Sequence, residues 1–198
     1  MIESRCCNHR LNPQLQVAFH IKRLMQFEAL IVAETEKLRS LHEAINQTVI
    51  FRDRSPSSNE AWRRACADFH SYQSRLDPYI ERVFNDANFE DQETIEFVIS
   101  FLELDPRFFR SGYIKEAMLP KIGRAELTSK QLKRLRVVLL DAIDRCGGRE
   151  FRRYCRLAAH IYDDNLVSEL RRVSSAGDAQ GSRSKMMLRY VEEAMANR

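Results

Sequence analysis

The sequence predicts an all-α protein, built as an antiparallel helical bundle with a long N-terminal helix. Hydrophobic residues recur three and four positions apart, and the alternating Val-, Ile- and Thr-rich runs typical of β-strands are missing. The first glycine is Gly112, and prolines stand only at positions 13, 56, 78, 106 and 120, so breakers separate long stretches of good helix formers. A hydrophobic content of 44% and a charged content of 30% are ordinary for a folded globular chain.

At 198 residues the chain is too short for two domains of ordinary size. We therefore expect a single helical domain over residues 1–173. Residues 174–183, SSAGDAQGSR, are small and polar, which predicts a flexible linker. A C-terminal helix is expected over residues 184–198, with one face formed by methionine, tyrosine and valine side chains. That face either docks onto the domain or exchanges with a second chain to form a homodimer.

The long N-terminal helix is expected over residues 14–53, because no glycine or proline interrupts the sequence between Pro13 and Pro56. Apolar residues recur there every seven positions, which is typical of a coiled coil. The helix therefore either forms a homodimer seam or packs on its own domain. The second heptad position favours packing on the domain, since it holds polar side chains that a stable zipper would exclude: His20, Glu34 and Thr48.

The core helices are expected over residues 58–173, and local capping signals place their starts. Ser57 with Glu60, and Thr128 with Gln131, have the spacing of a capping box. Asp77 precedes Pro78 as a cap would precede a first-turn proline. Asp91 stands before a segment that is apolar around its whole circumference, Ile95 to Leu104, and this segment is expected to lie at the centre of the core.

Short helices with tight junctions continue from residue 91 to residue 173. This part of the chain resembles the helix-hairpin stacking of HEAT-like repeat proteins, on the segments FVISFLELDPRFFRSGYIKEAML (97–119), QLKRLRVVLLDAIDR (131–145) and EFRRYCRLAAHIY (150–162). The resemblance rests on periodicity and covers under half of the chain. It implies a short stack of helix hairpins that binds partners along its surface.

Charge is distributed unevenly along the chain, although the net charge is only +4. Residues 1–106 hold 12 Lys and Arg against 17 Asp and Glu, whereas residues 107–156 hold 14 against 5. The N-terminus is charged where a signal peptide needs an apolar run, and no stretch of about 18 uncharged apolar residues follows. With five scattered cysteines, this pattern predicts a cytoplasmic protein that does not enter a membrane.

The segment GGREFRRYCRLAAHI, residues 147–161, predicts a helix with two distinct faces. At about 100° per residue, aromatic and aliphatic side chains fall on one side. Basic side chains fall on the other side, where like charges one turn apart repel each other. The nearest acidic residue is Glu150. We expect this basic face to bind a partner, together with two basic residues of the preceding helix, so that the contact set is Arg149, Arg152, Arg153, Arg156, His160, Lys133 and Arg134.

Three sources of negative charge remain open for this face: carboxylates of the same chain, an acidic protein, or the phosphates of a nucleic acid. Arginine pairs equally well with carboxylates and phosphates. Because no nucleic-acid recognition signature is present, the preferred hypothesis is a non-enzymatic interaction protein, an adaptor or inhibitor, that binds an acidic partner protein. The alternative is a helical protein that contacts the phosphate backbone of a nucleic acid.

The sequence contains no motif that ties a reaction to a backbone geometry, neither a nucleophile elbow nor a phosphate-binding loop nor a zincin helix. We expect no cofactor, no metal and no catalytic residues. Cys66 and His70 stand one turn apart, but two ligands do not make a metal site. The acidic run from Asp86 to Glu96 lacks the glycine of a calcium loop and is expected to be a solvated helix start.

Overall fold

The computed structural model describes residues 13–85, 89–145 and 150–197, and within these ranges every regular element is helical. The all-α prediction is therefore confirmed. None of the described helices is both long enough and apolar enough to cross a bilayer. In chain order the helices are α1 (Pro13–Val49), α2 (Pro56–Ser71), α3 (Asp77–Asn85), α4 (Gln92–Leu104), α5 (Ser111–Ile122), α6 (Ser129–Arg145), α7 (Phe151–Ile161), α8 (Asp164–Ser174) and α9 (Ala179–Ala196).

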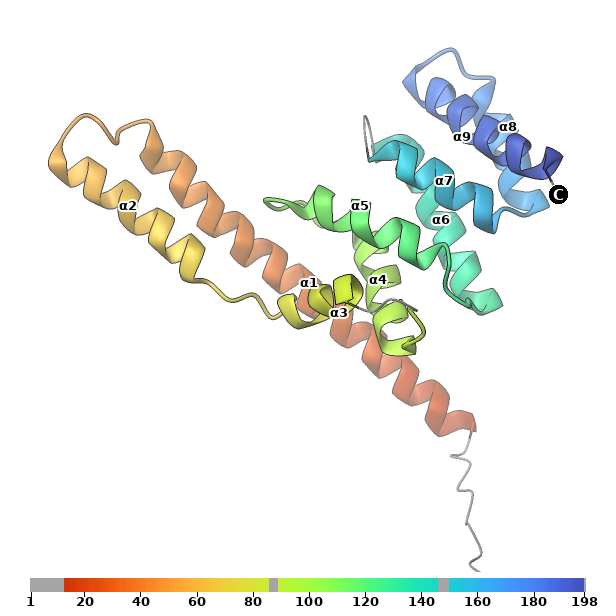
Figure 1. Ribbon diagram of the computed structural model, residues 1–198, viewed down its shortest axis with the longest axis horizontal. Coiled ribbons are helices and arrows are strands. Elements are labelled where there is room, and N and C mark those ends of the chain that lie inside the picture. Colours follow the sequence, from red (N-terminus) through yellow and green to blue (C-terminus); the bar gives the residue numbers. More distant parts are fainter. Residues whose placement is uncertain (1–12, 86–88, 146–149, 198) are drawn as a thin grey trace, which may run out of the picture.

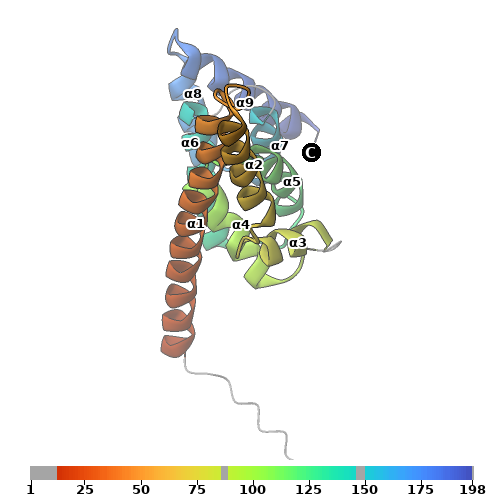
Figure 2. The ribbon, with the colours of Figure 1, turned by 90° about the vertical axis from the view of Figure 1, so that its left-hand side faces the viewer.

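The C-terminal half of α1 and the whole of α2 form an antiparallel arm that projects from the other helices, whereas the part of α1 around Phe27 and Ile31 packs on α4 in the core (Figures 1 and 2). The start of α2 differs from the expected cap at Ser57. Ser55 is the N-cap, and its Oγ accepts a hydrogen bond of 3.1 Å from the backbone N–H of Ser58. Pro56 takes the first helical position, where its missing N–H costs nothing. No residue of α2 is fully buried, so the arm is stabilised mainly at its base.

The body consists of successive helix pairs, α4–α5, α6–α7 and α8–α9 (Figure 1). Helices α4, α6 and α8 contact one another in that order, and so do α5, α7 and α9, which gives two layers. The core lies between these layers. Helix α4 is buried from Thr94 to Leu102, as its apolar circumference predicts, and each fully buried phenylalanine contributes about 1.5–3 kcal/mol.

Two of the expected caps are confirmed by reciprocal or paired hydrogen bonds. The Thr128 N–H donates to Gln131 Oε1 at 2.8 Å, and the Gln131 N–H donates to Thr128 Oγ1 at 3.3 Å. Asp91 caps α4 by accepting from the N–H groups of Glu93 and Thr94. At the start of α3, Asp77 reaches back to accept from the Ser74 N–H at 2.9 Å, so Ser74 marks the start of that turn.

The segment 174–183 is mostly helical rather than a flexible linker, which corrects the sequence-based expectation. Helix α8 ends at Ser174, and α9 already begins at Ala179. The small residues serve close packing: a Cβ on Gly181 would come within 1.9 Å of the Ala176 carbonyl oxygen. Helix α9 packs against α7 and α8 of its own chain, with Met187 and Val191 fully buried.

Candidate functional site: a basic groove between α5 and α7

Helix α7 has the two faces that its sequence predicts. Its aromatic, thiol and aliphatic side chains, from Phe151 to Ile161, are buried against the core. On the other side Arg152, Arg156 and His160 are exposed, and Arg153 is half-buried. The Nδ1–H of His160 donates to the carbonyl oxygen of Arg156 at 2.8 Å. Arg149, which belongs to the expected contact set, lies outside the described residues.

Helices α5 and α7 lie side by side and run in the same direction. Near their N-termini Lys115 pairs with Glu150 at 3.1 Å, and in the middle Arg153 Nε lies 3.4 Å from Glu116 Oε1. Farther along, a Cβ on Gly123 would come within 3.4 Å of Leu157 Cδ1. Gly123 thus lies beside Leu157, so the two helices are also in contact where α5 ends.

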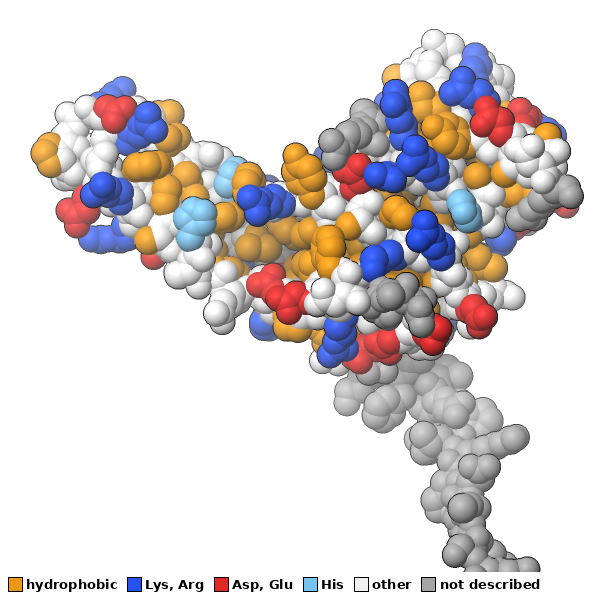
Figure 3. Space-filling model, viewed as in Figure 1, with side chains coloured by type: hydrophobic (Ala, Val, Ile, Leu, Met, Phe, Trp, Pro, Cys, Tyr) orange, Lys and Arg blue, Asp and Glu red, His pale blue; other side chains and the backbone are white. Residues whose placement is uncertain are grey.

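A recess of about 180 Å³ opens between the C-terminal parts of these two helices. We call it the basic groove. Pro120 is half-buried and supplies an apolar patch, whereas Leu119 and Leu157 lie beneath the groove and are 1% and 2% exposed. Figure 3 shows basic side chains gathered over α5 and α7 on this face of the molecule. The full lining is Leu119, Pro120, Gly123, Arg124, Arg153, Arg156, Leu157 and His160.

The basic groove keeps a net positive charge. Of its arginines, only Arg153 has an ion pair within the described part of the chain, with Glu116 at 3.4 Å. Each helix C-terminus nearby contributes roughly −0.5 charge. The groove is lined by three arginines, and Glu116 together with the two helix C-termini offsets about two of their three charges. A net charge of about +1 therefore remains, without any contribution from His160. The groove is therefore suited to an anionic group whose aliphatic stem can rest on the apolar patch.

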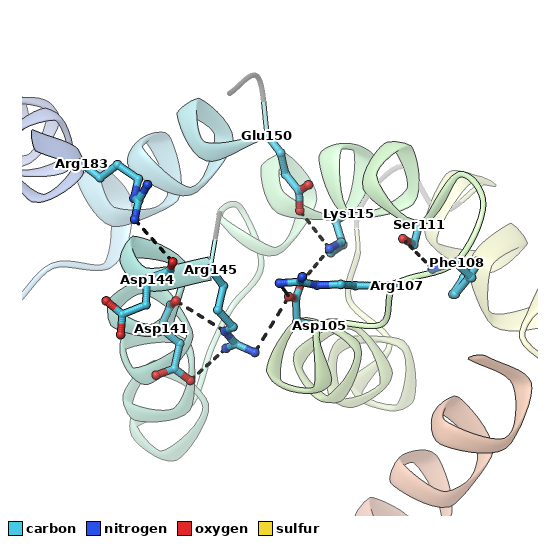
Figure 4. Close-up of polar contacts among 10 residues, drawn as sticks. All are labelled: Asp105, Arg107, Phe108, Ser111, Lys115, Asp141, Asp144, Arg145, Glu150 and Arg183. Atoms are coloured by element: carbon cyan, nitrogen blue, oxygen red, sulfur yellow. Dashed lines mark hydrogen bonds and ion pairs between the residues drawn. The ribbon is translucent and has the colours of Figure 1, made fainter. Parts of the chain in front are cut away.

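Buried ion pairs set the spacing of α5 and α7 (Figure 4). Lys115 is 4% exposed, and its Nζ lies 2.6 Å from Asp105 Oδ1 and 3.1 Å from Glu150 Oε1. Burial lowers the pKa of Lys115, but these two carboxylates outweigh that effect and raise it above the ordinary value. Since Lys115 belongs to α5 and Glu150 precedes α7, this pairing holds the walls of the groove together.

Three described members of the expected contact set do not line the basic groove: Arg134, Lys133 and Arg152. Arg134 binds carboxylates of its own chain, Glu96 and Glu103, both at 2.6 Å, and it is mostly buried. Its place in a partner-binding set is therefore wrong: its guanidinium serves to join α6 to α4. Lys133 is exposed on α6 but is not part of the groove lining.

Arg124 is the groove residue that sequence reasoning missed. It follows Gly123 at the end of α5, and no described carboxylate lies within ion-pairing distance of it. Its local sequence resembles an ordinary helix end, where a cation is favoured by the helix dipole. Only the parallel packing of α5 on α7 brings Arg124 beside Arg153 and Arg156.

The other candidate site residues do not assemble into a metal centre. Within the described ranges, no group of three or more His, Cys, Asp or Glu side chains is placed to hold a metal ion. Cys66 and His70 therefore have no third candidate ligand in that part of the chain. Asp91 and Glu93 belong to the start of α4, as expected for a solvated helix N-terminus.

Cys155 is expected to be inert toward alkylation in the folded protein. Its side chain is fully buried, and this burial raises the pKa of the thiol to about 12. Cys66 is only partly buried. Iodoacetamide at neutral pH, followed by peptide mass mapping, should modify Cys66 well before Cys155 and should reach Cys155 only after unfolding in urea. Equal labelling of the two thiols in native protein would contradict the buried position of Cys155.

The chain matches no family model, and it has no match among curated proteins or solved structures. The geometry and charge of the basic groove are therefore the basis for proposing a function.

Proposed function

We propose that this chain is an interaction protein that captures an acidic segment of a partner protein in the basic groove. The single observation that carries the proposal is the convergence of Arg124, Arg153, Arg156 and His160 around one recess between α5 and α7. Guanidinium groups bind carboxylates through paired hydrogen bonds, which gives both affinity and orientation. Arg152 is exposed on α7 one turn before Arg156, and it extends the same positive surface.

The shape of the groove supports a protein ligand over a nucleic acid. The half-buried Pro120 gives it an apolar patch against which the methylene groups of a glutamate side chain can pack. Its lining contains no Phe, Tyr or Trp ring on which a base could stack. The basic groove is also a single small recess, whereas a phosphate backbone is usually followed by an extended row of cations.

We also propose that the body acts as a short helix-hairpin stack of the HEAT-like kind. The ordered contacts of α4, α6 and α8, and of α5, α7 and α9, support this proposal. In such stacks the exposed helices of one layer form the binding surface. The basic groove lies between two successive helices of one layer, which is consistent with that use.

Charge reversal tests the proposed function directly. A variant carrying Arg153→Glu and Arg156→Glu should bind fluorescein-labelled poly-glutamate at least about tenfold more weakly than the wild-type chain in fluorescence anisotropy. Arg156 is exposed and Arg153 is half-buried, so circular dichroism should change little, while loss of the Arg153–Glu116 ion pair should lower the melting temperature only modestly. Wild-type binding should also weaken as salt is raised, because the contacts are ionic.

The matched control is Arg63→Glu, which reverses an exposed arginine of the α2 arm that does not line the groove. It should leave poly-glutamate binding unchanged. Duplex DNA of similar charge is the second probe. Retention of DNA without retention of poly-glutamate would replace the proposed function by nucleic-acid binding, and failure of the wild-type chain to bind either polymer at low salt would overturn it.

A further inference from the structure

A second recess lies between the arm and the body. We call it the arm recess: it has a volume of about 400 Å³ and is lined from α1, α2, α3 and the start of α5. This volume falls in the range of ordinary ligand sites, roughly 300–1,000 Å³. Figure 3 shows apolar side chains in the hollow between the arm and the body. The lining residues that bear on the inference are Leu38, Phe69, Ile80, Phe108, Phe109 and Ile114.

Phe109 is the most distinctive apolar group of this recess, since it remains 48% exposed. Its ring is stacked on His42 with a centroid separation of 5.1 Å, and it meets Phe69 edge-to-face at 5.8 Å. The next residue, Arg110, has a φ of 71°, in the left-handed region that residues other than glycine seldom adopt. A strained backbone conformation of this kind persists only where the surrounding structure enforces it, and such positions cluster at binding sites. Here the conformation holds an aromatic ring at the mouth of a recess.

Helix α5 lies between the arm recess and the basic groove and contributes side chains to both. Ile114 lines the arm recess, and Gly123 lines the basic groove. At about 100° per residue these two positions lie on opposite flanks of the helix. The surface between the two flanks carries Tyr113, which is 68% exposed, and the half-buried Ala117 and Pro120.

We infer that the two recesses act as one site with two parts, which binds a partner segment bearing carboxylates at one end and a bulky aromatic side chain at the other. The segment crosses α5 over Tyr113, Ala117 and Pro120. A helix with its side chains is about 10–12 Å wide, and an extended chain covers about 3.3 Å per residue. Ile114 and Gly123 also stand nine residues apart along α5, about 13–14 Å at 1.5 Å per residue, so the diagonal path is roughly 17 Å and about five residues of the partner separate the aromatic anchor from the carboxylates.

This inference rests on the proposed function, because the acidic end of the segment occupies the basic groove. Charge complementarity places the carboxylates of the segment in the basic groove. Because α5 contributes to both recesses, the aromatic end of the same segment lies in the arm recess. The arm recess alone would accept many apolar groups. Joined to the basic groove, it selects acidic segments that contain an aromatic residue over segments that are only acidic.

Two labelled polymers of matched length separate the inference from the proposed function: poly-glutamate, and a random copolymer of glutamate and tyrosine with glutamate in excess. The wild-type chain should bind the copolymer about tenfold more tightly, which is the scale expected for burying one aromatic side chain. Phe109→Ala should abolish this preference while leaving poly-glutamate binding intact. The matched control is Phe84→Ala, since Phe84 is 51% exposed and lines neither recess.

Each outcome has a definite meaning. Equal binding of both polymers by the wild-type chain would overturn the two-part site and leave the proposed function standing, whereas binding of neither would overturn both. If the copolymer bound but the variant with Arg153→Glu and Arg156→Glu kept full affinity, the recesses would act separately and the inference would be wrong. Circular dichroism of Phe109→Ala should match the wild type, because this ring is half exposed.

Discussion

Replacement of Lys115 by methionine should lower the free energy of unfolding by about 3–5 kcal/mol, the cost of leaving buried carboxylates without their counter-ion. Lys115 contacts both Asp105 and Glu150, and the Asp105 side chain is only 8% exposed (Figure 4). Arg107 and Arg145 also approach Asp105, at 3.5 and 4.0 Å, but both have far more exposed side chains. They cannot replace the buried ammonium group.

Urea unfolding followed by circular dichroism measures this effect. The double variant Lys115→Met with Asp105→Asn should recover part of the lost stability, because it removes the unpaired charge as well as its partner. Lys130→Met, at an exposed lysine near the start of α6, is the control and should change stability by less than about 0.5 kcal/mol. Equal stability of Lys115→Met and the wild type would show that the pairing is not formed in solution.

The stabilisation from Lys115 should depend on pH in a defined direction. Its pKa is raised in the folded protein, so the contribution is complete below the ordinary lysine pKa and is lost as the pH rises through the folded value. The difference in unfolding free energy between the wild type and Lys115→Met should therefore shrink only in strongly alkaline buffer. Because Lys115 ties α5 to Glu150 ahead of α7, the variant should also bind poly-glutamate more weakly although Lys115 does not line the groove.

Signals within one or two helical turns predicted much of this fold. The Thr128–Gln131 box and the Asp91 cap depend on residues two or three positions apart, and both form as expected. The two faces of α7 follow from the same local spacing. In each case the atoms that interact are brought together by the helix itself, so the sequence alone contains the geometry.

Contacts between distant segments could not be predicted in this way. Arg134 and Arg156 have the same side chain and similar neighbours in sequence, but Arg134 is neutralised by carboxylates of α4, 31 and 38 residues away. Arg124 enters the basic groove only because α5 and α7 run parallel. The small residues of 174–183 suggested a linker, since composition does not distinguish flexibility from close packing such as that of Gly181 on Ala176.

Glu34 should stabilise the base of the arm almost as strongly as Lys115 stabilises the packing of α5 on α7. This carboxylate is 1% exposed, yet it accepts hydrogen bonds from Tyr72 Oη at 2.8 Å, Ser74 Oγ at 2.8 Å and Arg75 Nε at 2.6 Å. The Arg75 backbone N–H adds a fourth bond at 3.2 Å. These bonds join α1 to the segment between α2 and α3. Since Tyr72 and Ser74 also line the arm recess, Glu34 maintains the shape of that recess.

Glu34→Gln should destabilise the protein by about 2–3 kcal/mol at neutral pH, because an amide cannot accept all these bonds and loses the ion pair with Arg75. Burial raises the pKa of Glu34, but the bonds from Arg75, Ser74 and Tyr72 outweigh it and hold the pKa below the ordinary value. The stabilisation is therefore present above the ordinary glutamate pKa and is lost as the pH falls through the folded value. Urea unfolding at neutral and acidic pH should show that the difference in unfolding free energy between the wild type and Glu34→Gln shrinks in acid.

Glu36→Gln is the matched control, since Glu36 is exposed on the same helix and should show little effect at either pH. Hydrogen exchange should locate the change: Glu34→Gln should speed exchange in the segment that joins α2 to α3 more than in α7. In the same variant the preference for the glutamate–tyrosine copolymer should weaken while poly-glutamate binding persists, because the arm recess is disturbed and the basic groove is not. A gap between wild type and Glu34→Gln that stayed constant down to strongly acidic pH would mean that the buried carboxylate does not hold the arm.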